Sequence, residues 1–303
     1  MYSSFSGIEI SKRALFAHQR AQQNISHNVA NSTTPGYSRQ RVILESTYTQ
    51  YGVGTTWQLG TGVSVSDINR IRDDFTDMQF RKENSSLGRW DVQDNVLKQV
   101  ESIFGEPSDI GISSVLNKFW ESLETLSKDA SAEEARETVK ERGITLANTI
   151  NHATYQLKDL QEDLNYRISI KVDEINSIAR QIADINQQIQ QLEIHGTSAA
   201  DLRDKRDILL DDLSTLVQHE SYEDENGRFT INIGGAILVK GNDSANLEFD
   251  AETAEIRWKE YEVEARILNG ELKGLIELRD DRVGHYLEQL DVFVEGFVEA
   301  FND

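Results

Sequence analysis

The chain has 303 residues, enough for one or two domains with a sizeable core. It carries 52 Asp and Glu against 31 Lys and Arg, and a net charge of −21 disfavours nucleic acid as a partner because the surface repels phosphates. With no Cys, it forms no disulfide, no Cys-ligated zinc site and no cysteine nucleophile. It also lacks a signal-peptide pattern and the run of about eighteen apolar residues of a membrane span.

The charge is unevenly distributed along the chain. Residues 1–60 contain five basic and two acidic side chains, a local net charge of +3. The other 243 residues therefore carry a net charge of −24. This asymmetry predicts that the two regions meet different environments or different partners.

The first predicted element is a helix from residue 5 to about residue 31. Few of its side chains are large and apolar, so it is marginal in water unless it packs on something else. Its apolar positions are Phe5, Ile8, Leu15, Ile25 and Val29. The sequence Pro35-Gly36 predicts the turn that ends this region, because Pro disfavours helix before it and Gly permits a tight turn.

Extended segments are predicted at 41–44, 48–51 and 63–68, with turns at Gly52, Gly54, Gly60 and Gly62. The helical pattern then returns from Arg70 to Phe104, stops at Gly105-Glu106-Pro107 and continues as a short helix over 113–127.

A helix of about sixty residues is predicted next. Ser131 and Glu134 have the spacing of a capping box at its start, and no Pro follows before His195-Gly196. A coiled-coil seam runs along it, with Lys171 as the one polar interruption. The seam positions are Leu164, Ile168, Ile175, Ile178, Ile182, Ile185, Ile189 and Leu192.

After a turn at 195–198, residues 199–217 are predicted to return as an antiparallel helix. The hydrophobic period then changes to two, and Glu225-Asn-Gly227 is a hairpin signal. Strands are predicted at 228–233, 236–240, 246–249, 255–258 and 262–267, followed by a helix over 272–303. The fold class is therefore mainly α: a long antiparallel, coiled-coil-like helical rod with a small antiparallel β unit and an N-terminal helix.

We find no catalytic, cofactor or metal motif. The six His form no zinc-binding pair, and the paired glycines lack the spacing of a nucleotide-binding loop. Asp201, Asp204 and Asp207 share a helix face, but the basic residues between them predict a solvated row of weak ion pairs instead of a cation site. We therefore expect no enzyme activity and no cofactor.

The segment 24–40, Asn-Ile-Ser-His-Asn-Val-Ala-Asn-Ser-Thr-Thr-Pro-Gly-Tyr-Ser-Arg-Gln, resembles the N-terminal signature of the flagellar rod, hook and hook-associated axial proteins. Ser38-Arg39-Gln40 is most similar to the members that form the first hook–filament junction. Further similar segments occur at 131–147, 175–185, 201–213, 229–241 and 270–279, so the resemblance covers most of the chain.

The resemblance implies a structural subunit that connects hook to filament, exported without a cleaved signal and located outside the cell in the flagellum. The implied partners are copies of itself in a ring, the hook protein, the second junction protein and an export chaperone, with no nucleic acid or membrane. The implied assembly residues are Phe5, Ile8, Leu15, Ile25, Asn28, Val29, Asn31, Pro35, Gly36 and Tyr37. Family members normally end in a second terminal helix, so we expect this chain to be truncated.

Four regions are expected: an assembly segment at 1–40, an elongated helical body at 41–218, the β unit at 219–268 and a returning helix at 269–303. Three alternatives remain open. The chain could be a distal-rod or hook subunit, a hydrolase on a flagellar scaffold, or a helical spacer that acts inside the cell. The last two have no motif in their favour.

Overall fold

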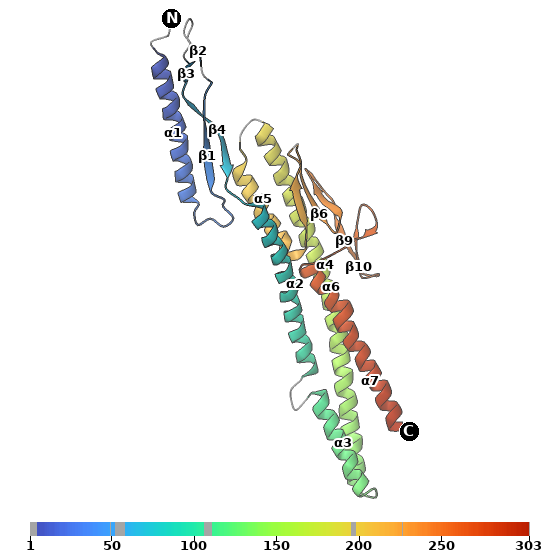
Figure 1. The fold of residues 1–303 in the computed structure, drawn as a ribbon. Helices are drawn as coiled ribbons and strands as arrows, with labels where there is room; N and C mark the ends of the chain where they lie inside the picture. The colour runs from blue at the N-terminus through green and yellow to red at the C-terminus, as the bar shows by residue number, and fades with distance from the viewer. Residues whose placement is uncertain are drawn as a thin grey trace.

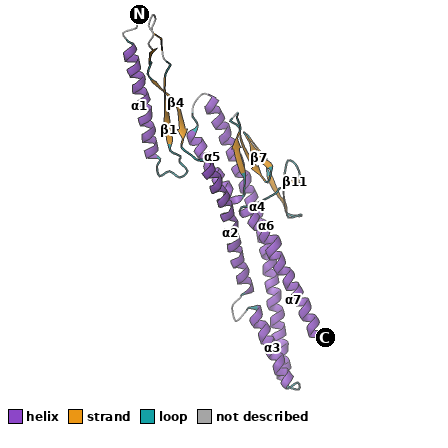
Figure 2. Ribbon diagram, viewed as in Figure 1, coloured by secondary structure: helices purple, strands orange, loops and turns teal. Residues whose placement is uncertain are grey.

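The structure, a computed structural model, describes residues 5–48, 50–51, 58–105, 111–194, 198–225 and 227–302. It shows a long helical rod with two small sheets on one side and an N-terminal arm at one end (Figure 1). Helices make up most of the described chain, and strands gather in the arm and beside the rod (Figure 2). This architecture confirms the predicted mainly α fold class.

The N-terminal arm combines one helix with a β-ladder. Helix α1 (Ser6–Ala30) packs along antiparallel strands β1 (Gln40–Ser46) and β4 (Val63–Arg70). Beyond them, β2 (Gln50–Tyr51) pairs with β3 (Gln58–Leu59). The predicted helix and extended segments are confirmed, whereas the turns predicted at 52 and 54 lie outside the described residues.

Four consecutive helices form most of the rod, and the helices of the last helical region, described below, pack along the longest of the four as well. The four are α2 (Asp74–Phe104), α3 (Ile112–Lys128), α4 (Glu133–Ile194) and α5 (Ala200–Leu216). The 62 residues of α4 span about 90 Å at 1.5 Å per residue, and α3, α5 and α2 pack along it. Gly105 ends α2 with a φ of +61°, as predicted, and the predicted turn at 195–197 lies outside the described residues.

The predicted seam of α4 is confirmed over most of its length. Its seven-residue repeat of Ile168, Ile175, Ile182 and Ile189 is at most 4% exposed. Lys171 sits among these positions because its ammonium lies 2.9 Å from a carboxylate oxygen of Glu271. The seam prediction is wrong at its last member, Leu192, which is 41% exposed. Leu192 lines an open groove between α1 and the start of α5, where no side chain covers it fully.

The capping box predicted at the start of α4 is also wrong. The hydroxyl of Ser131 donates to the carboxylate of Asp129 at 2.7 Å, and the helix begins at Glu133. The carbonyl of Ala132 accepts the first backbone hydrogen bond of the helix, from Arg136. The carboxylate of Asp129 is the stronger acceptor, so it accepts the hydrogen bond of the Ser131 hydroxyl and Ser131 stays outside the helix.

The β unit consists of two antiparallel sheets beside α4. One has the strand order β5-β6-β7-β8, and the other β9-β10-β11. The strands are β5 (Glu220–Glu223), β6 (Phe229–Ile233), β7 (Ala236–Lys240), β8 (Asp243–Ser244), β9 (Leu247–Asp250), β10 (Glu255–Trp258) and β11 (Val263–Glu264). The predicted hairpin is confirmed: Gly227, with a φ of +74°, donates its amide to the carbonyl of Asp224 at 2.9 Å. Asn226 lies outside the described residues.

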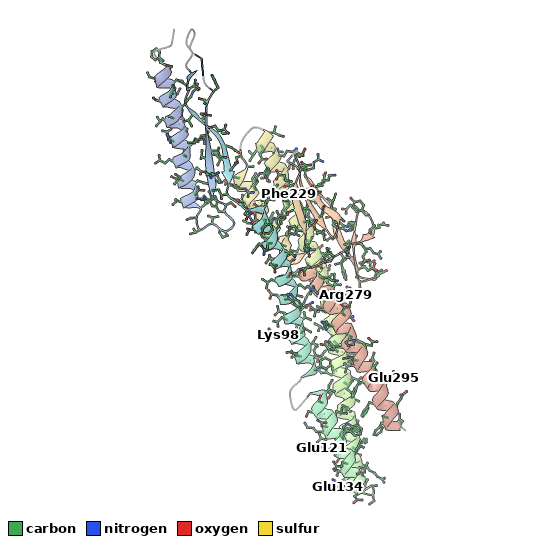
Figure 3. The ribbon with its side chains drawn as sticks, viewed as in Figure 1. Lys98, Glu121, Glu134, Phe229, Arg279 and Glu295 are labelled. Atoms are coloured by element: carbon green, nitrogen blue, oxygen red, sulfur yellow. The ribbon has the colours of Figure 1, made fainter. Side chains whose placement is uncertain are left out.

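The last helical region is interrupted. Helix α6 (Glu271–Glu277) passes through a π-helical turn (Leu278–Val283) into α7 (Gly284–Asn302), where the sequence predicts one regular helix. In the π-turn, Arg279 is buried and donates to Asn165 on α4 at 3.1 Å. Figure 3 labels Arg279 at this turn and Glu295 farther along α7. Along this region Leu275, Leu278, Val283 and Leu290 are buried and Leu287 is partly buried, but Phe301 is 52% exposed.

Candidate assembly segment and its ionic joint

Helix α1 has two different faces. The face against β1 and β4 carries mainly small and amide side chains, with Ala17 and Asn24 buried and Ile10 next to Gly62. The five large apolar side chains predicted for assembly point elsewhere and are 58–70% exposed. They are Phe5, Ile8, Leu15, Ile25 and Val29. The small inward residues let the helix approach the ladder closely. Because the five large apolar side chains are exposed, packing inside this chain does not explain why they are apolar.

Asn28 joins the end of α1 to strand β1. Its side-chain Nδ2 donates to the backbone carbonyl of Gln40 at 2.8 Å, and its Oδ1 accepts from the backbone amide of Gln40 at 2.9 Å. The same Oδ1 accepts from the hydroxyl of Tyr37 at 2.7 Å. A carboxamide has a donor and an acceptor in one plane, so Asn28 pairs with the amide and the carbonyl of Gln40 as the backbone of a neighbouring strand would. The signature Asn28 and Tyr37 therefore fix where the chain turns.

The other signature residues shape the turn itself. Asn31 donates from Nδ2 to the carbonyl of His27 at 3.1 Å, which satisfies a carbonyl at the end of α1. Tyr37 donates its amide to the carbonyl of Thr34, with Pro35 and Gly36 between them. Gly36 has a φ of +73°, the conformation that a type II turn requires after Pro.

The turn lies directly on the rod. A Cβ on Gly36 would come within 2.3 Å of a side-chain carbon of Ile208 on α5. Ser38 donates its amide to the carboxylate of Asp204 at 3.1 Å, and Gln40 donates from Nε2 to Asp201 at 2.9 Å. The structure therefore brings Asn28, Asn31, Pro35, Gly36 and Tyr37 together at this junction, whereas the five apolar residues spread along α1.

Seven charged side chains lie where the arm meets the rod, and we call them the ionic joint. They are Arg70, Arg72, Arg81, Asp77, Asp204, Asp207 and Asp211. Arg70, at the end of β4, donates to Asp204 at 2.8 Å and to Asp207 at 2.6 Å. Arg81 on α2 donates to Asp211 at 2.8 Å.

Asp207 is the centre of the ionic joint. Its carboxylate oxygens lie 2.6 Å from Arg70, 3.4 Å from Arg81 and 3.6 Å from Arg72. Its side chain is 11% exposed and that of Asp204 is 7% exposed, so water screens these pairs weakly. Strand β4, helix α2 and helix α5 are thus held together by charge-assisted hydrogen bonds.

Burial and charge shift the pKa of several groups here. Burial would lower the pKa of Arg72, but the carboxylates of Asp77, Asp207 and Asp211 outweigh it and raise this pKa. Burial raises the pKa of Asp211 despite its arginine partners. Burial, together with the charges of Asp201 and Asp204, raises the pKa of the Tyr37 hydroxyl. With four carboxylates and three guanidinium groups, the joint contains one more acidic than basic side chain.

The prediction of a solvated row of ion pairs on α5 holds for Asp201, whose side chain is 67% exposed, but is wrong for Asp204 and Asp207. These two are buried because Ser38 and three arginines from distant segments cover this face. The local spacing of acids and bases could not reveal partners more than a hundred residues away. Within the described residues, no group of three or more His, Asp or Glu is arranged to hold a metal ion, and no helix combines the length and apolar character of a membrane span.

The fold and this joint define a class of protein: an elongated helical rod with an N-terminal arm whose helix exposes large apolar side chains. Comparison with known proteins specifies the family. Residues 97–303 match the model of the flagellar hook-associated protein FlgK helical domain, so the chain belongs to the FlgK family.

Two relatives and one solved structure show how far the similarity extends. Flagellar hook-associated protein 1 of Bacillus subtilis is 37% identical over 84% of this chain and 52% of its own length. That of Salmonella typhimurium is 28% identical over 95% of this chain and 54% of its own length. The flagellar hook junction protein FlgK of Burkholderia pseudomallei has a TM-score of 0.57 and 25% identity, covering 67% of this chain and 38% of that one. The chain thus spans about half the length of the curated relatives it matches.

Proposed function

We propose that this chain is a structural, non-catalytic subunit of the bacterial flagellum that assembles at the hook–filament junction and connects hook to filament. Membership of the FlgK family supports the class of protein, and the exposed apolar side of α1 carries the proposal. Exposing five large apolar side chains to water costs free energy in a monomer. That cost is removed when neighbouring subunits cover them.

In this proposal, α1 is the assembly helix and the turn at 31–37 directs it away from the rod. The assembly unit extends past residue 40 to residue 70, because β1 and β4 pack on α1 and end at the ionic joint. The helical rod at 71–218 is then the body, 219–268 is the β unit and 269–303 the returning helix. A fixed joint matters because an arm held at one angle presents α1 in the same direction in every copy.

The proposed partners are copies of the chain in a ring, the hook protein, the second junction protein and, before export, a flagellar chaperone. The proposed location is outside the cell, after export without a cleaved signal. The N-terminal segment, which is poor in acidic residues, suits packing among its own copies because like charges repel at short distance.

The test removes the apolar surface of α1 without removing the helix. We expect the full gene product with Ile8→Gln, Leu15→Gln and Val29→Gln to keep its thermal stability, because these side chains are exposed, but to lose incorporation and motility. The matched control, Ile8→Val with Leu15→Met and Val29→Ile, keeps the apolar surface and should incorporate normally. Deletion of residues 1–31 should likewise leave a folded rod that is absent from flagella.

Normal filaments and normal motility in the Gln variant would contradict the proposal. Immunogold labelling locates the parent protein: labels at the hook–filament boundary support it, whereas labels along the hook or in the rod identify a different axial subunit. A purified protein that hydrolyses substrates in a broad hydrolase screen would contradict the non-catalytic part.

A further inference from the structure

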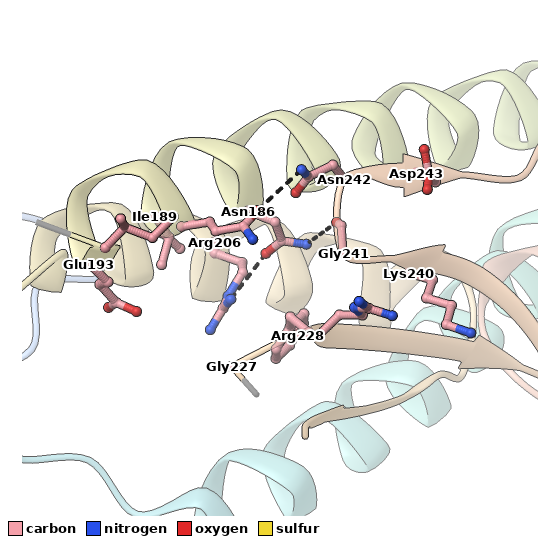
Figure 4. Close-up of a pocket in the computed structure, with 13 residues that line it drawn as sticks. Asn186, Ile189, Glu193, Arg206, Gly227, Arg228, Lys240, Gly241, Asn242 and Asp243 are labelled. Carbon is pink, nitrogen blue, oxygen red and sulfur yellow. Dashed lines mark hydrogen bonds between the residues drawn. The ribbon is translucent and has the colours of Figure 1, made fainter. Parts of the chain in front are cut away.

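A polar pocket of about 790 Å³ lies between the end of α4, helix α5 and the sheet β5–β8 (Figure 4). Three cationic side chains line it: Arg206, Arg228 and Lys240. Two acidic side chains line it as well, Glu193 and Asp243. Neither the assembly helix nor the ionic joint uses this pocket.

Arg206 is the buried member of the pocket. Its side chain is 4% exposed, and its guanidinium stacks on the ring of Phe229 at 3.8 Å from the centroid. It donates from Nη1 to Asn186 at 3.0 Å and from Nη2 to Glu223 at 3.2 Å. Its third guanidinium nitrogen, Nε, carries one N–H group, which has no hydrogen-bond partner among the described residues. A buried donor without an acceptor costs free energy, which a bound acceptor would recover.

The other two cations also have unused charge. Neither Arg228 nor Lys240 forms an ion pair with any residue that the structure describes. Of the two acids, Glu193 is held by Arg203 at 2.9 Å, so only Asp243 is left to offset them. With Arg206 paired to Glu223 and Glu193 paired to Arg203, Arg228 and Lys240 against Asp243 leave the concave, polar lining with one positive charge in excess. Such a surface suits a carboxylate ligand.

The sheet β9–β11 provides carboxylates on a different surface of the molecule. Residues 247–264 contain seven acidic and two basic residues. Because Leu247, Ile256 and Trp258 are buried, the alternate positions of these strands face outward. Glu248 and Glu264 are exposed there, and neither forms an ion pair with Arg257, their common partner in the strand register.

We propose that the cationic pocket binds carboxylates of the sheet β9–β11 from a second copy of this chain. The proposal rests on the proposed function, because assembly supplies the second copy. Parallel copies cannot make this contact reciprocally, so between them it is heterologous and continues from copy to copy along a helix. On α4, Asn186 contacts the pocket strand at Gly241 and Asn176 contacts the acidic sheet at Leu247. These anchors are ten residues apart, so parallel copies would be displaced by about 15 Å along the rod.

The experiment uses the absence of Cys from these 303 residues. Asn242→Cys at the pocket and Glu248→Cys on the acidic sheet are introduced together into the full gene product. Isolated flagella are treated with a short bismaleimide cross-linker and analysed by immunoblot. We expect a ladder of cross-linked multimers from the double variant and none from either single Cys variant.

Charge variants test the chemistry of the contact. Adding Arg228→Glu and Lys240→Glu should reduce the ladder about tenfold or more, because attraction becomes repulsion. Adding Glu255→Lys and Glu264→Lys to that variant should restore it. The matched control, Arg142→Glu with Lys158→Glu, makes the same charge change on exposed positions of α4 and should leave the ladder intact. The neutral pair Arg228→Gln and Lys240→Gln should give an intermediate loss, and circular dichroism checks that each variant folds.

The outcomes separate this inference from the proposed function. A protein present in flagella that gives no ladder, a dimer alone, or a ladder insensitive to Arg228→Glu and Lys240→Glu overturns the pocket contact and leaves the proposed function standing. A protein that the immunoblot does not find in flagella overturns the proposed function and this contact with it.

Discussion

The ionic joint predicts that two neighbouring carboxylates of α5 differ strongly in their contribution to stability. Asp207 lies within 4 Å of three guanidinium groups and is 11% exposed, whereas Asp211 is 31% exposed and its pKa is raised by burial. Breaking a buried pair costs about 3–5 kcal/mol. Because Arg70 keeps Asp204 and Arg81 keeps Asp211, we expect Asp207→Asn to cost about 3 kcal/mol, the lower end of that range.

Asp211→Asn is the matched control. It removes the acidic side chain that the joint has in excess and keeps an oxygen that can accept from Arg81, so we expect a cost below about 1 kcal/mol. Urea denaturation at pH 7 measures the free energy of unfolding, and hydrogen exchange in β1 and β4 measures whether the arm loosens. Equal losses from the two variants, or a neutral Asp207→Asn, would refute the reasoning that burial and the number of partners decide the value of each carboxylate.

Three further predictions concern single residues. Asn28→Ala removes both hydrogen bonds to the backbone of β1 and should cost about 2 kcal/mol, seen as faster amide exchange at the start of that strand, while Asn28→Asp should lose only the donated bond. Gly36→Ala should cost about 2 kcal/mol in urea denaturation, from its positive φ and the clash with Ile208, whereas Gly60→Ala, which meets open space, should be nearly neutral. Burial, and then the charge of Arg81, lower the pKa of His219 to about 4, so the folded chain keeps it neutral. The unfolded chain binds a proton below about pH 6.5, and stability should therefore fall by roughly 3 kcal/mol as the pH drops from 6.5 to 4. The same slope in His219→Gln would contradict this last assignment.

Secondary structure was predicted correctly from the sequence wherever a hydrophobic period persists over many residues. The absence of Pro between Ser131 and His195 predicted the length of α4, and the heptad repeat predicted its buried seam. The alternation in β6 predicted a strand in which Ile231 and Ile233 are buried. The prediction failed where a specific contact of one side chain overrides the local sequence pattern. Ser131 has the spacing of a helix cap but bonds to Asp129, and the regular apolar stripe after Leu272 contains a π-turn where Arg279 reaches α4.

The candidate site shows the same division. The signature residues from Asn28 to Tyr37 were identified from the sequence, since their order resembles that of the flagellar axial proteins. Their contacts were not, because the carboxamide of Asn28 bonds to a strand twelve residues away and Ser38 bonds to Asp204 far along the chain. The charge asymmetry of the sequence did not point to the joint, because Arg70, Arg72 and Arg81 all lie outside the basic segment 1–60.

By itself, the sequence determined the helical rod, the position of the β unit and the apolar residues that α1 exposes, because these follow from periodicity and composition within each segment. Only the tertiary structure decided that Asp204 and Asp207 are buried, that three arginines from β4 and α2 surround them, and that Arg206 and its neighbours form a cationic pocket. The physical reason is that the energy of a charge depends on its burial and on the partners within about 4 Å of it, and folding alone brings those partners together from distant parts of the chain.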